Sequence, residues 1–275
     1  MADIFKAGFL KTLWIIREYL SQIVIGGGWV PLIYYHYLIG DKSLNPLRTL
    51  DIDFFVGDNV PVIGSESLDQ LLTKAGLKSE FKSLDTPPVV HYEGKIENFD
   101  VEIEFLTDQI GSKQDKVIEV QKGLHAEVLR YISISLENVI TVSIDDFVEV
   151  ERPQHFQVRV PTPAAFIFHK GLVFKKRNKR NKKAKDLFYI FDVLVNFSNN
   201  IDYILNDFGL LKNKYKPWFE KFISNMEMYF ANLTSEGIQL VLEQRPISSL
   251  PRLTDAQFSA FVYGTFQELI SNIKK

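Results

Sequence analysis

The hydrophobic pattern divides the chain into two parts with different periods. Up to about Val160, apolar residues recur at helical spacing in some segments and alternate with polar residues in others, which predicts a mixture of helices and strands. From Pro161 onward the helical period prevails. Long helices are expected there over residues 164–176, 184–196, 216–231 and 254–273.

This pattern predicts an α+β fold, with a mixed twisted sheet and helices over residues 1–160 and an all-helical C-terminal domain over residues 161–275. In the first domain, helices are expected over 3–21, from the three glycines through about Tyr37, and near 66–75. Strands are expected over Ile23–Ile25, 50–56, 89–106, 138–150 and 155–160, and the last two are expected to extend the same sheet.

The segment 89–106 reads as a β-hairpin that turns around Glu93-Gly94-Lys95. Its second half alternates apolar and acidic residues, so the two kinds should face opposite sides of the strand. The apolar residues are Val101, Ile103 and Phe105, and the acidic residues are Asp100, Glu102 and Glu104.

Composition narrows the class of protein. Apolar residues make up 46% and charged residues 24% of the chain, as in folded soluble proteins. Without cysteine there is neither a disulfide scaffold nor a Cys-ligated zinc site. The five histidines lack metal-ligand spacing, and each is expected to be structural. Charged residues interrupt the apolar N-terminal segment, and we expect a cytoplasmic protein without a signal peptide or a membrane partner.

Two aspartates mark the candidate chemistry. Asp51 and Asp53 stand one residue apart in a strand-like run, so their side chains share a face, with Cα atoms roughly 6.5–7 Å apart. Like charges held this close repel each other, and a bound cation would relieve the repulsion. The pair therefore indicates a Mg²⁺ site, although acidic residues on an exposed edge strand would show the same spacing.

The order of several motifs resembles the minimal nucleotidyltransferase superfamily, and within it AbiEii-like proteins. The motifs are Gly27-Gly28-Trp29, Arg48-Thr49-Leu50-Asp51-Ile52-Asp53, Glu102-Ile103-Glu104-Phe105-Leu106, Lys170 and Lys185-Asp186. The resemblance implies a nucleotidyltransferase-like fold and an enzyme that moves a nucleoside monophosphate from an NTP to a hydroxyl group. Its cofactor would be Mg²⁺ or Mn²⁺.

The resemblance also assigns roles in the metal site. Asp51 and Asp53 would hold two ions and a third carboxylate would complete the site. Alternation cannot choose that third residue among the acidic residues of the hairpin. The position before a short apolar pair favours Glu104, and Glu102 is the reserve.

Further residues would contact the nucleotide. Gly27 and Gly28 would let the triphosphate approach the start of a helix, although the same glycines also suit a tight turn. Lys170 and Lys185 would contact the nucleotide, by the same resemblance. Arg48 would either pair with phosphate or neutralise the acidic cluster. Gly28 departs from the family, because many relatives have serine there.

The basic run 175–185 holds eight Lys or Arg residues in eleven. It is typical of a solvated loop, and it could also steer an RNA acceptor such as tRNA. A small molecule is the alternative acceptor. The resemblance further implies an antitoxin protein as a partner of a toxin. The alternatives are a non-catalytic nucleotide-binding or interaction protein of the same fold, and a general RNA-binding protein.

Overall fold

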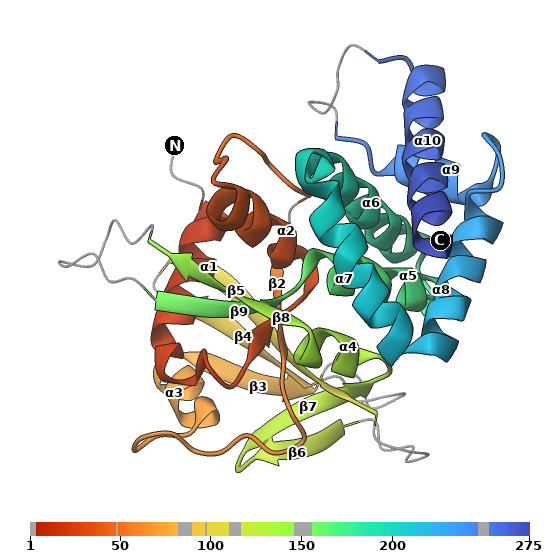
Figure 1. Ribbon diagram of the computed structural model, residues 1–275. Coiled ribbons are helices and arrows are strands. Elements are labelled where there is room, and N and C mark those ends of the chain that lie inside the picture. Colours follow the sequence, from red (N-terminus) through yellow and green to blue (C-terminus); the bar gives the residue numbers. More distant parts are fainter. Residues whose placement is uncertain are drawn as a thin grey trace. The chain divides into compact units, whose positions relative to one another are not determined.

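The computed structural model describes residues 4–47, 49–81, 90–96, 98–109, 117–145, 156–246 and 253–275 (Figure 1). The chain forms two compact units, Met1–Pro161 and Thr162–Lys275. The assignment of domains 1–160 and 161–275 stays a prediction.

A mixed sheet is the centre of the first unit, which confirms the predicted fold class. It has seven strands in the order β1-β2-β5-β4-β3, with β7 beside β5 and β6 beside β7. The pairs β2·β5 and β5·β7 are parallel and the others antiparallel. The strands are β1 (Val24–Ile25), β2 (Asp51–Phe55), β3 (Leu77–Phe81), β4 (Val90–Ile96), β5 (Phe99–Asp108), β6 (Val117–Gln121) and β7 (Leu124–Leu129).

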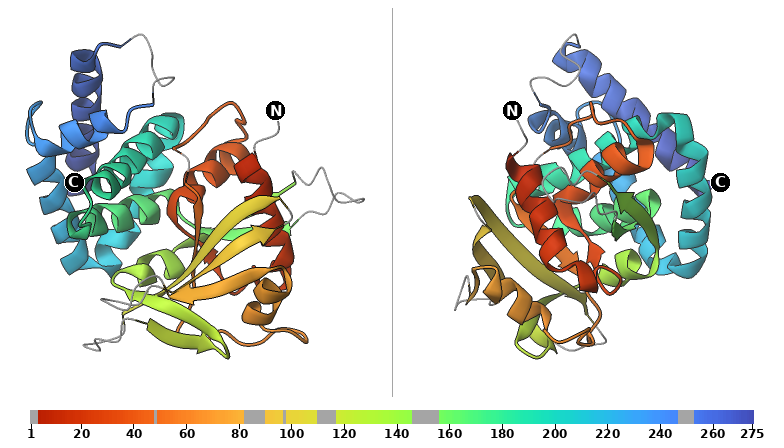
Figure 2. Two further views of the ribbon diagram at one scale, coloured as in Figure 1. Left: turned by 180° about the vertical axis from the view of Figure 1, so that it is seen from behind. Right: turned by 90° about the vertical axis from the view of Figure 1, so that its left-hand side faces the viewer.

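Helices complete this unit. Helix α1 (Ile4–Ile15) packs on β5, as the right-hand view of Figure 2 shows, and buries Phe9 and Leu13. The predicted glycine-led helix is observed as three successive turns, η2 (Gly27–Trp29), α2 (Val30–Ile33) and the π-helical η3 (Tyr34–Ile39). Helix α3 (Leu68–Lys74) begins with a Ser67–Gln70 capping box, and α4 (Ile132–Glu137) follows β7.

Two details of the predicted strands are wrong. The expected hairpin turn at Glu93-Gly94-Lys95 lies inside β4, which continues to Ile96, opposite Phe99. Gly94 is needed for another reason, since a Cβ there would lie 2.9 Å from the carbonyl oxygen of Gly76 on the neighbouring chain segment.

The second error concerns the strands after α4. Strands β8 (Val139–Ile144) and β9 (Phe156–Pro161) form a separate two-stranded sheet instead of extending the large one. Alternation identifies a strand, but it does not identify the strand's hydrogen-bonding partner.

The second unit is helical, as predicted, and aromatic side chains fill its core. Phe168, Phe208, Phe219 and Phe222 pack together with ring centroids 5.5–6.0 Å apart. Besides the four expected helices, the structure has α7 and α9. The helices are α5 (Pro163–Val173), α6 (Arg180–Asn196), α7 (Ile201–Lys214), α8 (Lys216–Tyr229), α9 (Glu236–Glu243) and α10 (Asp255–Lys274). Within the described ranges, no helix has the length and apolar character needed to cross a membrane.

Candidate functional site

Four carboxylates occupy one face of the parallel pair β2·β5. Asp51 is aligned with Glu102, and Asp53 with Glu104. All four residues are partly exposed, whereas the residues between them, Ile52 and Ile103, are buried on the opposite face. Neighbouring strands lie about 4.8 Å apart, so two rows of paired acidic residues result. We call these four residues, Asp51, Asp53, Glu102 and Glu104, the acidic face.

Asp100 stands apart from this arrangement. The pairing of β5 with β2 covers Glu102 to Leu106 only, and Asp100 is aligned with Lys95 on β4 instead. Its carboxylate is exposed and lies 3.6 Å from the Lys95 Nζ. Of the three acidic residues that alternation could not separate, the register therefore leaves Glu102 and Glu104 beside the aspartates.

The turn after β1 brings Gly27 against Asp53. The Gly26 backbone N–H donates to the Asp53 carbonyl oxygen at 2.8 Å. Gly27 has a φ of +63°, and a Cβ at this position would lie 1.7 Å from Asp53 Oδ2. Glycine is required here both for the backbone conformation and for the space that the carboxylate occupies. The turn thus packs directly on Asp53, one of the predicted metal ligands.

Two further contacts delimit the acidic face. The Thr49 hydroxyl donates to Asp51 Oδ1. Beyond the acidic residues, the same strands continue into a buried apolar cluster with α4, formed by Val24, Phe55, Leu106 and Ile132. The carboxylates therefore lie at one end of this sheet face and the core covers the other end.

The acidic face fits a divalent cation by its chemistry. Mg²⁺ prefers a few carboxylates and keeps water or phosphate as its other ligands, and a bound cation would lower the repulsion between aligned acidic residues. Within the described residues, however, no three His, Asp or Glu side chains are already gathered around one point. The roles of Asp51, Asp53, Glu104 and the reserve Glu102 therefore stay predictions. The predicted phosphate ligand Arg48 lies outside the described residues.

Strand β4 widens this face with two residues that the sequence analysis did not connect with it. His91 is aligned with Glu104, and Glu93 with Glu102. The His91 Nε2 lies 2.8 Å from Glu93 Oε2. The signal was present in the sequence, because the two residues alternate like the acidic residues of β5. The misplaced hairpin turn at 93–95 concealed it.

The second unit joins the family motifs Lys170 and Lys185-Asp186 through an ion pair. The Lys170 Nζ lies 2.6 Å from Asp186 Oδ1, and the Arg177 Nε lies 2.8 Å from Asp186 Oδ2. Lys170 and Asp186 are buried. Burial alone raises the pKa of Asp186, but the two cations and their hydrogen bonds outweigh it and hold the pKa below its usual value. Lys185 is half-buried on α6.

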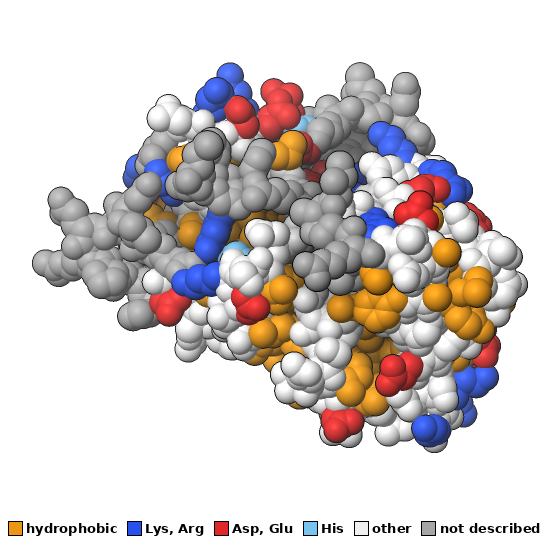
Figure 3. Space-filling view, turned by 90° about the horizontal axis from the view of Figure 1, so that it is seen from above, with side chains coloured by type: hydrophobic (Ala, Val, Ile, Leu, Met, Phe, Trp, Pro, Cys, Tyr) orange, Lys and Arg blue, Asp and Glu red, His pale blue; other side chains and the backbone are white. Residues whose placement is uncertain are grey.

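The basic run 175–185 is partly neutralised by acidic residues of α9. Arg180 contacts Glu243 at 2.6 Å, and Lys183 lies 3.7 Å from Glu236. Lys175, Lys176, Lys179 and Lys182 are exposed. Figure 3 likewise shows basic and acidic side chains next to each other at several places on the face it presents. The run begins in a 3₁₀ turn, η4 (Phe174–Lys176), and from Arg180 on it belongs to helix α6, so only residues 177–179 fit the expected loop.

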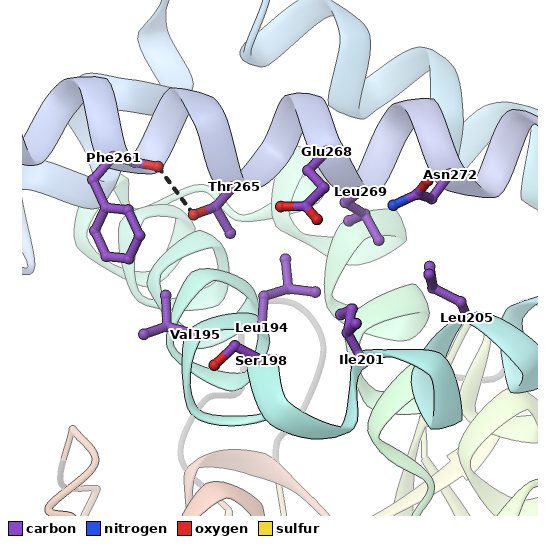
Figure 4. A pocket seen from close by; sticks show the side chains of 10 residues that line it. All are labelled: Leu194, Val195, Ser198, Ile201, Leu205, Phe261, Thr265, Glu268, Leu269 and Asn272. Atoms are coloured by element: carbon purple, nitrogen blue, oxygen red, sulfur yellow. Dashed lines mark hydrogen bonds between the residues drawn. The ribbon is translucent and has the colours of Figure 1, made fainter.

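A pocket of about 230 Å³ lies within the helical unit (Figure 4). None of its ten lining residues is Lys or Arg, so the pocket does not suit a triphosphate. They are Leu194, Val195, Ser198, Ile201, Leu205, Phe261, Thr265, Glu268, Leu269 and Asn272.

Comparison with known proteins identifies the class. The chain matches the family described as Nucleotidyltransferase over residues 12–206 and belongs to it. The superfamily resemblance is thereby confirmed. The solved structure of an antigenic nucleotidyltransferase-like protein from Paracoccidioides brasiliensis is similar over 79% of this chain and 92% of that protein's chain, with 14% sequence identity. The TM-score of 0.35 is too low to support an argument. No curated protein matches significantly.

Proposed function

We propose that the protein is an AbiEii-like, metal-dependent nucleotidyltransferase that transfers a nucleoside monophosphate from an NTP to a hydroxyl acceptor. The observation that carries the proposal is the alignment of Asp51 and Asp53 with Glu102 and Glu104 on adjacent parallel strands, in a chain of the nucleotidyltransferase family. Carboxylates are the protein ligands that Mg²⁺ prefers, beside water and substrate phosphates.

The proposed site combines metal ligands with a glycine turn for the nucleotide. Asp51 and Asp53 would hold both ions, and Glu104, with Glu102 in reserve, would hold the ion beside the acceptor hydroxyl. Bound divalent ions stabilise the attacking and leaving oxygens of an in-line displacement. Gly27 keeps the space in which the Asp53 carboxylate lies. An incoming NTP would meet Gly27 and Gly28 at the start of the glycine-led helix.

By the family resemblance, Arg48, Lys170 and Lys185 would contact the nucleotide. In this structure Asp186 holds the Lys170 ammonium group. A phosphate contact by Lys170 would therefore have to compete with that ion pair or share the charge with it.

RNA is the acceptor that we favour, with tRNA as the first candidate. Support comes from the exposed residues Lys175, Lys176, Lys179 and Lys182, which can contact phosphates with an affinity that falls as salt rises. A toxin role with a separate antitoxin belongs to the same proposal. If it is correct, induced expression should arrest growth, and Asp53→Asn should abolish the arrest.

Labelled NTPs, Mg²⁺ and total RNA test the reaction directly. We expect label to appear on RNA, and we expect Asp53→Asn to abolish it because a metal ligand is lost. Tight NTP binding without pyrophosphate release for any acceptor would instead support a non-catalytic nucleotide-binding protein.

A further inference from the structure

A buried histidine lies in the same row as the predicted third metal ligand. The His91 side chain is 1% exposed. Its residue is aligned with Glu104 on β5, and Glu104 in turn with Asp53 on β2. Directly opposed residues of antiparallel strands have Cβ atoms about 4.5–5.5 Å apart. The imidazole therefore lies within side-chain reach of Glu104.

Burying the His91 imidazole at this position costs free energy. Its Nε2 is held by Glu93 at 2.8 Å, but its Nδ1 is buried without a hydrogen-bond partner among the described residues. A buried polar atom without a partner costs roughly 1–3 kcal/mol, which an apolar side chain of similar size would avoid. Packing alone therefore does not account for a histidine here.

The neighbouring row shows what the histidine changes. Glu102 is aligned with another acidic residue, Glu93, across β5 and β4, and like charges at directly opposed positions repel each other. Glu104 instead lies opposite an imidazole that Glu93 holds in place. A fixed ring beside a long side chain restricts the rotamers of that side chain. Of the two candidates for the third ligand, Glu104 therefore has the supported position.

We propose that His91, held by Glu93, is a positioning residue that directs the Glu104 carboxylate toward Asp53 and so selects Glu104 over Glu102 as the third metal ligand. This inference rests on the proposed function. Groups that orient metal ligands from behind typically change metal affinity 10–100-fold when they are removed. His91→Leu should therefore weaken divalent-ion binding without removing any ligand.

The experiment measures Mn²⁺ binding by electron paramagnetic resonance of the free ion, with NTP present and without turnover. We expect His91→Leu to bind Mn²⁺ with an affinity lower by about 10-fold or more. His91→Gln should largely restore binding, because its amide can still donate to Glu93. Glu104→Gln should lose more affinity than Glu102→Gln. His36→Leu is the matched control, since His36 is also buried and its Nδ1 has no partner within the described part of the chain, and it should bind Mn²⁺ like the wild type.

The outcomes separate the two hypotheses. If Asp53→Asn loses Mn²⁺ while His91→Leu binds it like the wild type, the positioning role is wrong and the proposed function stands. Equal losses for His91→Leu and the His36→Leu control would also overturn the positioning role, as a general effect of losing a buried imidazole. If the wild type binds no Mn²⁺ with NTP, both hypotheses fail.

Discussion

Replacing Gly27 by alanine tests whether the Asp53 carboxylate lies where the structure places it. The new Cβ would stand 1.7 Å from Asp53 Oδ2, and real Cβ atoms essentially never approach closer than 3.0 Å. The carboxylate must therefore retreat by about 1.3 Å. A displacement of about 1 Å at a reacting centre can cost on the order of 100-fold in rate. We expect Gly27→Ala to lower kcat by about that factor and to weaken Mn²⁺ binding.

The backbone contributes a second, separable effect. Gly27 has a φ of +63°, and a left-handed conformation costs roughly 1–2 kcal/mol for a residue with a Cβ. Gly40 has a φ of +82°, but a Cβ there would meet no atom of the described residues within 4 Å, so Gly40→Ala carries the backbone cost alone. Urea unfolding should show that Gly27→Ala loses more unfolding free energy than Gly40→Ala.

Activity distinguishes the two variants further. Gly40→Ala should retain full transfer activity and Mn²⁺ affinity at a temperature where it is folded. If Gly27→Ala matches Gly40→Ala in unfolding free energy, activity and Mn²⁺ affinity, the close packing of Gly27 on Asp53 is refuted, and with it this part of the site.

Three more predictions concern the helical unit. Asp186→Asn should lower the free energy of unfolding, measured in urea, by about 3–5 kcal/mol, because it leaves the buried Lys170 without its partner. The double variant Lys170→Met with Asp186→Leu should recover most of this loss. Burial, and then the charge of Lys170, lower the pKa of His169 to about 3. Its contribution to the free energy of unfolding is therefore complete above about pH 6.5 and declines by about 1.4 kcal/mol per pH unit as the pH falls toward 3. Between pH 7 and pH 4.5 the wild type should lose more unfolding free energy than His169→Gln, and equal losses would contradict this prediction. Charge reversal of the exposed Lys179 and Lys182 should weaken RNA binding and flatten its salt dependence in filter binding, whereas unchanged binding would exclude the basic run as the contact.

The error at Gly94 shows how local sequence signals mislead. Glycine between polar residues is the usual mark of a turn, and this reading hid the continuation of β4. The position actually needs glycine because the backbone of Gly76 approaches closely. This contact is between β4 and the turn before β3, so no pattern within one strand can reveal it.

Local chemistry was readable from the sequence alone. The period of two in β5 separated its acidic residues from its buried ones. The same period in β2 placed Asp51 and Asp53 on one face of that strand, because side-chain direction depends only on neighbouring backbone angles. The helical character of the second unit was readable for the same reason.

Only the tertiary structure decided which of these residues meet. The alignment of β2 with β5 joins Asp53 to Glu104, the pairing of β4 with β5 adds His91, and the packing of α5 on α6 pairs Lys170 with Asp186. These pairings depend on strand register and helix packing between segments distant along the chain. Register is set by how whole elements bury their apolar faces together, and the spacing of residues within any one segment does not contain it.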